Sequence, residues 1–216
     1  MSASAADRRL IVVEGLPGSG HTEFARWIGS QEDWYAACVN HHVETRGQRL
    51  SSLSPLLQRL LERFEAMQQL AGADLFRKRV VTDYTFETHL LWARALLPER
   101  DWLLYRKIAG VIAAPAVQPD LVVYLQAPES GLVPELRALD KTVDLDRWRE
   151  LITAYNHHFF EYEQAPLLVV RTASSDWLDR DAARAALWQQ VQSFQGGKTY
   201  LLGQSDFWEG GHPAGG

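Results

Sequence analysis

A glycine-rich stretch near the N-terminus constrains the fold of this chain more than any other feature. Residues 11–22 read Ile-Val-Val-Glu-Gly-Leu-Pro-Gly-Ser-Gly-His-Thr. An apolar strand leads into spaced glycines followed by threonine, the arrangement in which backbone N–H groups at a helix N-terminus wrap a phosphate. The chain is therefore expected to open with a strand, a phosphate-binding loop and a helix. The candidate nucleotide-binding residues are Gly15, Gly18, Ser19, Gly20, His21 and Thr22.

One position departs from the phosphate-binding pattern, because residue 21 is histidine where the pattern requires lysine. The lysine reaches the β and γ phosphates with a long, permanently charged arm, whereas a histidine side chain is shorter and mostly neutral at pH 7. Loss of a comparable electrostatic stabiliser lowers reaction rates by about 10²- to 10³-fold. The loop is thus expected to keep its phosphate cradle and to lose its catalytic charge.

Composition and charge exclude several classes of protein. With 216 residues, 46% of them hydrophobic, the chain is long enough for one domain with a full core. A net charge of −5 argues against a nucleic-acid partner held by general electrostatics. No run approaches the ~20 apolar residues of a membrane span, and residues 1–9 lack the apolar segment of a signal peptide. The single Cys38 excludes an internal disulfide and fits a reducing compartment, so the protein is expected to be cytoplasmic. The Cys38 thiol is expected to be buried.

Short apolar runs alternate with segments of helical periodicity along the chain. Continuous apolar runs such as Leu121–Leu125 are typical of a parallel sheet that is buried on both faces. Their alternation with helices indicates an α/β fold with a doubly wound parallel sheet surrounded by helices. Strands are predicted over 9–14, 35–39, 79–82, 121–125 and 167–170, and helices over 22–28, 53–70, 90–97, 102–114 and 145–162.

The sequence predicts a single domain over residues 9–195, preceded by a flexible N-terminus over 1–8. Glycine and polar residues dominate from residue 196 onward, so 196–216 is expected to be a flexible tail. The neighbouring His41 and His42 suggest a metal site, but adjacent residues of an extended chain point in opposite directions, and no cysteine or carboxylate cluster joins them. No metal is therefore expected at these histidines.

Five blocks along the chain carry a resemblance to a known family. They are the loop at 15–22, Ala73–Phe76 with Val80–Glu87, Pro119–Ala127, Ala154–Asn156 with Phe159–Phe160, and Ala165–Val170. Together they resemble the deoxynucleoside kinase family, particularly its bacterial deoxyadenosine and deoxyguanosine kinase branch, over roughly residues 10 to 175. The resemblance implies a P-loop nucleoside kinase fold and ATP-dependent phosphorylation of the 5′-hydroxyl of a purine deoxynucleoside.

Three family positions carry over with the residue type that the chemistry needs. The resemblance implies that Thr22 is a ligand of Mg²⁺, that Asp83 is a catalytic acidic residue near this metal, and that Arg137 is a lid cation, with Lys141 close by. Phosphoryl transfer depends mainly on positioning and on neutralising phosphate charge, which gives each group a physical role. Each also has a plain structural alternative: Asp83 as a strand-end cap, and Arg137 and Lys141 as part of a solvated helix face.

Other family positions are altered. The glutamate base expected after the second strand has no match, since Asn40 cannot take a proton and Glu44 lies four residues late. A histidine at 41 or 42 could replace it, because its pKa is near neutrality. The glutamine that pairs with the nucleobase is replaced by Leu56, and the nearby Gln58 is expected to point elsewhere on its helix. The arginine-rich lid is shortened.

Four functional groups are altered while the scaffold remains recognisable. This pattern favours weak selection for catalysis together with continued selection for the fold. The leading hypothesis is a deoxynucleoside-kinase-like protein that is catalytically weak or inactive and acts as a partner or regulatory subunit. Its partner would be an identical chain or an intact kinase paralogue, forming a homodimer or heterodimer through the apolar faces of 90–97 and 102–114.

Two alternatives stay open at this point. The first is an active deoxynucleoside kinase, with ATP and Mg²⁺ as cofactors. In it, His21, a histidine at 41 or 42 and Arg137 take over the roles of the altered groups. It predicts an acid-shifted pH optimum, because a protonated His21 regains positive charge. The second is a nucleotide-binding sensor that holds ATP or a deoxynucleoside triphosphate without transfer chemistry.

Overall fold

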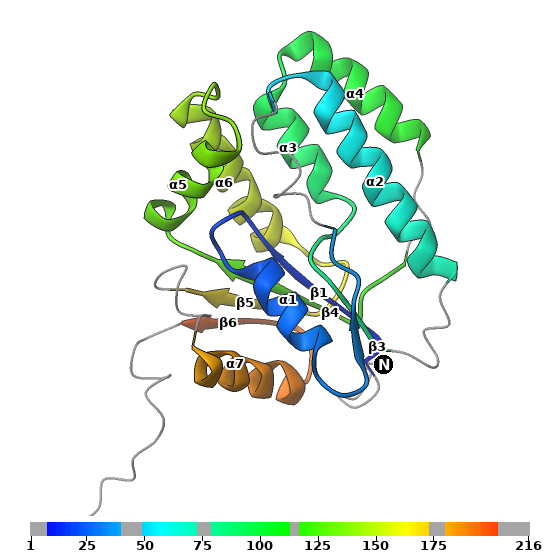
Figure 1. Cartoon of the computed structure of the whole chain (residues 1–216), viewed down its shortest axis with the longest axis vertical. Coiled ribbons are helices and arrows are strands. Elements are labelled where there is room, and N and C mark those ends of the chain that lie inside the picture. Colours follow the sequence, from blue (N-terminus) through cyan, green and yellow to red (C-terminus); the bar gives the residue numbers. More distant parts are fainter. Residues whose placement is uncertain (1–7, 40–48, 73–78, 113–116, 173–179, 203–216) are drawn as a thin grey trace, which may run out of the picture.

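The chain folds into alternating strands and helices around one sheet (Figure 1). The computed structural model describes residues 8–39, 49–72, 79–112, 117–172 and 180–202. Among these residues, no helix is both long and apolar enough to cross a bilayer. The strands are β1 Leu10–Gly15, β2 Trp34–Ala36, β3 Arg79–Thr82, β4 Leu121–Gln126, β5 Leu167–Arg171 and β6 Lys198–Leu202. The helices are α1 His21–Gly29, α2 Leu53–Gly72, α3 Thr88–Leu96, α4 Glu99–Val111, α5 Glu129–Leu139, α6 Leu145–Glu161 and α7 Asp181–Ser193.

The six strands form one sheet in the order β2-β3-β1-β4-β5-β6, and every neighbouring pair is parallel. The doubly wound parallel sheet predicted from the sequence is therefore confirmed. Strand β1 pairs with β3 on one side and with β4 on the other, so the loop after β1 lies where the winding direction changes. Ligands of doubly wound sheets bind at the carboxyl edge beside such a switch point.

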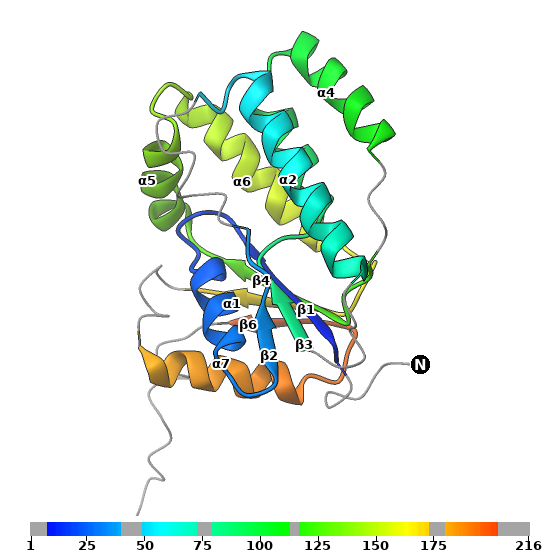
Figure 2. The ribbon, with the colours of Figure 1, turned by 45° about the vertical axis from the view of Figure 1, so that its right-hand side comes forward.

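Helices cover both faces of the sheet (Figure 2). Helices α1 and α7 pack on one face through Phe24, Ile28, Leu187 and Val191. Helices α2, α3, α5 and α6 cover the other face, and α4 lies outside them against α2 and α3. Alternate residues of each strand point to opposite faces, so Val12 and Val122 enter the larger core while Ile11 and Val13 enter the other. This two-sided burial explains why the central strands β1, β4 and β5 are mostly apolar.

Three elements differ from the sequence prediction. Residues 198–202 were expected in a flexible tail, but β6 pairs with all five residues of β5, so the prediction is wrong for these residues. An edge strand such as β6 buries little side-chain surface. Its polar and apolar residues therefore alternate only weakly, and the sequence gives no clear strand signal. Helices α5 and α7 were not among the predicted helices; α5 contains Pro134, and four of the first six residues of α7 are alanine. Residues 203–216, including Phe207 and Trp208, lie outside the described residues.

Candidate functional site

The loop between β1 and α1 has the backbone conformation that its glycines predict. Gly18 has a φ of 91° and Gly20, which caps α1, a φ of 81°, values that favour glycine strongly. The Ser19 N–H donates to the Leu16 carbonyl at 2.9 Å, which closes the turn. A Cβ atom on Gly18 would also lie 2.7 Å from the Gly131 carbonyl of α5. The loop is thus a tight turn with α5 directly against it.

The His21 side chain turns back into this loop. Only 4% of its surface is exposed, and its imidazole lies between two hydroxyls: Nδ1 is 3.0 Å from Ser19 Oγ and Nε2 is 3.3 Å from Thr22 Oγ1. The pKa of His21 is lowered to about 3 by burial, with smaller effects from the charges of Arg63 and Arg26. The residue that replaces the lysine is therefore neutral and held within the loop.

Hydrogen-bond donors and acceptors determine the tautomer of His21. Thr22 Oγ1 gives its only hydrogen to Asp83 Oδ2 at 2.8 Å, so it accepts from His21 Nε2. His21 Nδ1 is then unprotonated and accepts from the Ser19 hydroxyl. A serine, a histidine and an aspartate in one chain of hydrogen bonds suggest nucleophilic catalysis, but Ser19 is fully buried and has no surface open to solvent. The chain of bonds holds the loop together instead.

We expect His21 to remain neutral between about pH 5.5 and 8. Its pKa in the folded chain lies below the ordinary value of 6.5, so its contribution to stability is complete above pH 6.5 and is lost as the pH falls toward 3. The measurement is an NMR titration of the imidazole C–H signals, with His21→Gln to assign the signal. A His21 signal that titrates with a midpoint near 6.5 would contradict the buried, bridging imidazole.

The structure brings the two proposed metal ligands, Thr22 and Asp83, into direct contact. Asp83 is buried, its Oδ1 accepts the Val39 N–H at 3.0 Å, and burial raises the pKa of its carboxyl. The Thr22 oxygen is engaged by Asp83 on one side and by His21 on the other. Within the described ranges, no group of three histidine, cysteine or acidic residues is suited to a metal. Residues 15–22 of the loop contain no lysine or arginine, and the Thr22 hydroxyl is bonded to Asp83 in this structure.

The structure does not bring Arg137 to the loop. Helix α5 is held in the core by Leu132, Leu136 and Leu139, and Glu135 is the side chain that packs on Gly18. Two helical positions differ by about 200° around the axis, so Arg137 faces away from the side that Glu135 presents. Arg137 is exposed in the last turn of α5, in agreement with the solvated-face alternative. Lys141, just beyond the helix, is also exposed.

The carboxylate of Glu14 lies buried beneath the loop and was not singled out from the sequence. It accepts hydrogen bonds from the Thr85 N–H at 2.6 Å, the Thr85 hydroxyl at 3.1 Å, the Thr88 hydroxyl at 2.9 Å and the Gly15 N–H at 3.2 Å. Arg63 Nη1 donates to the same Thr88 hydroxyl at 2.9 Å. Burial raises the pKa of Glu14 to about 7, against the opposing effects of Arg63 and the hydrogen bonds. An acidic residue in an otherwise apolar strand was the available signal.

The remaining sequence candidates have structural roles or lie outside the described residues. Leu56 is buried in the core, and Gln58 bonds Glu62 at 2.9 Å on the exposed side of α2, as expected. Burial raises the pKa of the Cys38 thiol to about 12, in agreement with an unreactive thiol. Residues 40–48, which contain the possible replacement bases, are not among those described.

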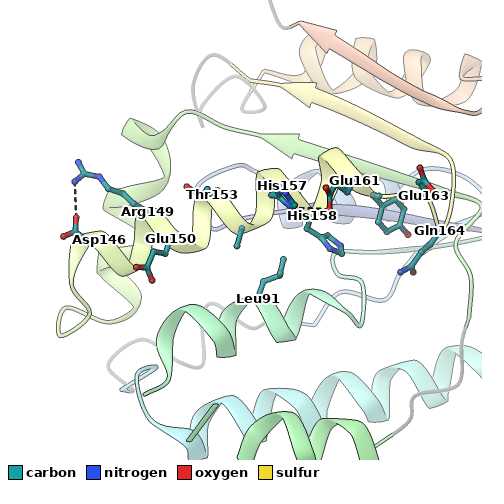
Figure 3. Close-up of a pocket in the computed structure, with 12 residues that line it drawn as sticks. Leu91, Asp146, Arg149, Glu150, Thr153, His157, His158, Glu161, Glu163 and Gln164 are labelled. Carbon is teal, nitrogen blue, oxygen red and sulfur yellow. Dashed lines mark hydrogen bonds and ion pairs between the residues drawn. The ribbon is translucent and has the colours of Figure 1, made fainter. Parts of the chain in front are cut away.

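A groove of about 900 Å³ runs along α6 on the face toward α3 (Figure 3). Leu91 of α3 faces α6 across this groove, and none of the loop residues lines it. A second hollow of about 490 Å³ continues it and shares Leu91, Glu150 and Ala154 with it. Helix α3 contains most of the 90–97 segment whose apolar face was expected to bind a partner.

Comparison with known proteins identifies the family of the fold. The sequence model of the deoxynucleoside kinase family matches residues 11–195. Among curated protein sequences, none matches this chain. Three structures of deoxyadenosine kinase from M. mycoides share the fold: one with the products dCMP and dCDP, one with dCTP and one with dATP, with TM-scores of 0.65, 0.64 and 0.62. They are 14%, 13% and 12% identical to this chain, and cover 86%, 86% and 85% of it and 100% of their own length.

Proposed function

Because this chain belongs to the deoxynucleoside kinase family, we propose that it is a member that has lost efficient phosphoryl transfer and acts as a partner or regulatory subunit. The family generally uses ATP and Mg²⁺. The observation that carries the proposal is the neutral His21 bridge between the Ser19 and Thr22 hydroxyls. It replaces a cation that phosphoryl transfer needs with a side chain that satisfies its own hydrogen bonds inside the loop.

Arg137 supports the same conclusion. A lid supplies transition-state charge only if its cation reaches the phosphate, and α5 presents Glu135 to the loop. Asp140 at the end of α5 accepts the Leu50 N–H at 2.6 Å and the Thr142 N–H at 2.8 Å, which anchors the helix end. A rotation that exchanged Glu135 for Arg137 would also expose the buried leucines of α5.

The active-kinase alternative depends on a charged His21. Burial lowers the pKa of His21 to about 3, far below the pH at which this alternative requires a proton. The sensor alternative needs only that the loop binds a nucleotide. Its glycines retain the required backbone conformation, so binding without transfer is the second candidate. A bulky residue in place of Gly20 would then abolish binding, and unchanged affinity would exclude the sensor.

The partner surface that we propose is the groove between α3 and α6. Leu91, Ala95 and Ala154 give it an apolar floor, and charged residues line its rim, the usual arrangement of an interaction surface. The occupant is a second copy of this chain or an intact kinase paralogue. Either partner would explain why the fold is retained while the loop chemistry is not.

Calorimetric titration with Mg·ATP and dATP, together with a turnover assay on the common deoxynucleosides, tests the proposal. We expect no turnover by the native chain between about pH 5.5 and 8 and at least about ten-fold tighter Mg·ATP binding by His21→Lys, since one added charge near the phosphates is worth about 1.4 kcal/mol or more. Turnover by the native chain would refute the subunit proposal. Tight ATP binding without turnover would favour the sensor.

A further inference from the structure

An acidic side chain, Glu135, packs directly on the phosphate loop. The Cγ and Cβ atoms of Glu135 lie 3.1 Å and 3.4 Å from the position that a Cβ atom on Gly18 would take. The carboxylate carbon is one bond of about 1.5 Å further along, so it lies within about 5 Å of the same point. The negative charge is therefore close to the backbone that would wrap a phosphate.

The fold holds Glu135 in this place. The leucines at 132, 136 and 139 lie on the adjoining side of α5, within about 100° of Glu135 around the helix axis, and are almost completely buried in the larger core. The Gly131 carbonyl, one turn before Glu135, also lies against Gly18, so the backbone of α5 and not a mobile tip meets the loop. Glu135 itself is exposed, so a change at this position removes charge without opening the core.

We propose that Glu135 is an electrostatic determinant that, together with the His21 substitution, keeps polyanions such as nucleoside triphosphates out of the loop. The inference rests on the proposed loss of phosphoryl transfer and adds a second cause for it. Replacement of lysine removes a positive charge from one side of the loop, and Glu135 places a negative charge on the side that α5 covers. The backbone N–H groups alone then have to offset the charge of an entering phosphate.

The test is an NMR titration of the Gly18 and Gly20 amides with inorganic tripolyphosphate, which detects weak binding and makes no nucleoside contacts. The chains compared carry Glu, Gln or Lys at position 135, each with His21 and with His21→Lys. At low salt we expect the affinity to rise by about three- to ten-fold at each step from Glu to Gln to Lys, because a unit charge at this distance is only partly screened. The gain should shrink at high salt.

Glu163→Gln is the matched control. Glu163 precedes β5 and is exposed, so it lies at the opposite edge of the parallel sheet from the loop and carries the same charge. We expect this variant to leave the affinity unchanged, which separates a local effect of Glu135 from a change in net charge. Urea unfolding of every variant checks that the fold is intact.

Equal affinities for the three side chains at position 135 would overturn the inference, as would a gain that Glu163→Gln reproduces or that salt does not reduce. Loop amides that fail to shift in every variant would overturn it as well, because removal of Glu135 would then not admit a polyanion. These outcomes concern relative affinities only. Turnover by the native chain, which would refute the proposed function, is measured separately.

Discussion

Replacing Glu14 by alanine is expected to lower the free energy of unfolding by about 3–5 kcal/mol, the usual cost of removing one partner from a buried ionic network. The Glu14 carboxylate is the acceptor for four donors from Gly15, Thr85 and Thr88. The positive charge of Arg63 favours the charged form of this carboxylate. Alanine would remove this acceptor from the Gly15 N–H and from the N–H and hydroxyl of Thr85, whereas the Thr88 hydroxyl would keep the Thr85 carbonyl at 3.2 Å. The measurement is urea unfolding followed by circular dichroism.

Glu14→Gln provides the control for this prediction. The amide oxygen keeps an acceptor for the Thr85 N–H, and the side chain has nearly the same volume, so the expected loss is much smaller than for alanine. A loss below about 1 kcal/mol in Glu14→Ala would show that Glu14 is not the centre of this network. If the alanine variant does not fold, the stability of Glu14→Gln and its loop NMR signals still test the role of the charge.

Replacing Trp148 by alanine is expected to cost about 3–5 kcal/mol, because a large buried side chain leaves a cavity that the surrounding core fills only in part. Trp148 on α6 is completely buried and packs edge-on against Trp92 of α3, with ring centroids 6.3 Å apart. Its indole N–H has no hydrogen-bond acceptor among the described residues. The contribution of Trp148 is therefore packing, and thermal or urea unfolding measures it.

Two further variants show whether packing is the cause. Trp148→Phe removes the unsatisfied N–H and keeps a ring, so it should cost clearly less than alanine. Phe160→Ala lies on the same helix, but Phe160 is 70% exposed, so we expect a change within about 0.5 kcal/mol. A cost for Phe160→Ala as large as that for Trp148→Ala would mean that the face carrying Phe160 is covered, for example by a partner.

The packing of the cores is compatible with the proposed loss of efficient phosphoryl transfer. Both main cores consist mostly of strand and helix residues, and His21 and Asp83 are not part of either. Replacing the loop lysine therefore removes a charge without opening a cavity. The polar groups of the loop remain satisfied because His21, Thr22 and Asp83 bond to one another. The histidine is therefore compatible with stability, and under the proposed function its neutral side chain is what lowers phosphoryl transfer.

Much of the architecture could be predicted because its signals are local. The apolar run that ends at Gly15 and the repeated leucines of α2 have periods that correspond directly to a buried strand and a long helix. Strand β6 was missed because an edge strand needs apolar residues on only part of one face. Helix α5 was not predicted, since its first turns contain glycine and proline.

The sequence by itself determined the parallel α/β class, the family and the histidine at the critical position of the loop. Each of these follows from residue types at fixed spacings along the chain. Only the tertiary structure decided where that histidine points, that Glu14 joins Thr85 and Thr88 beneath the loop, and that α5 turns Glu135 rather than Arg137 toward Gly18. The Glu14 contacts join residues that are distant in sequence, the Glu135 contact depends on helix rotation, and the direction of His21 depends on its side-chain conformation; the packing of the whole core sets all three.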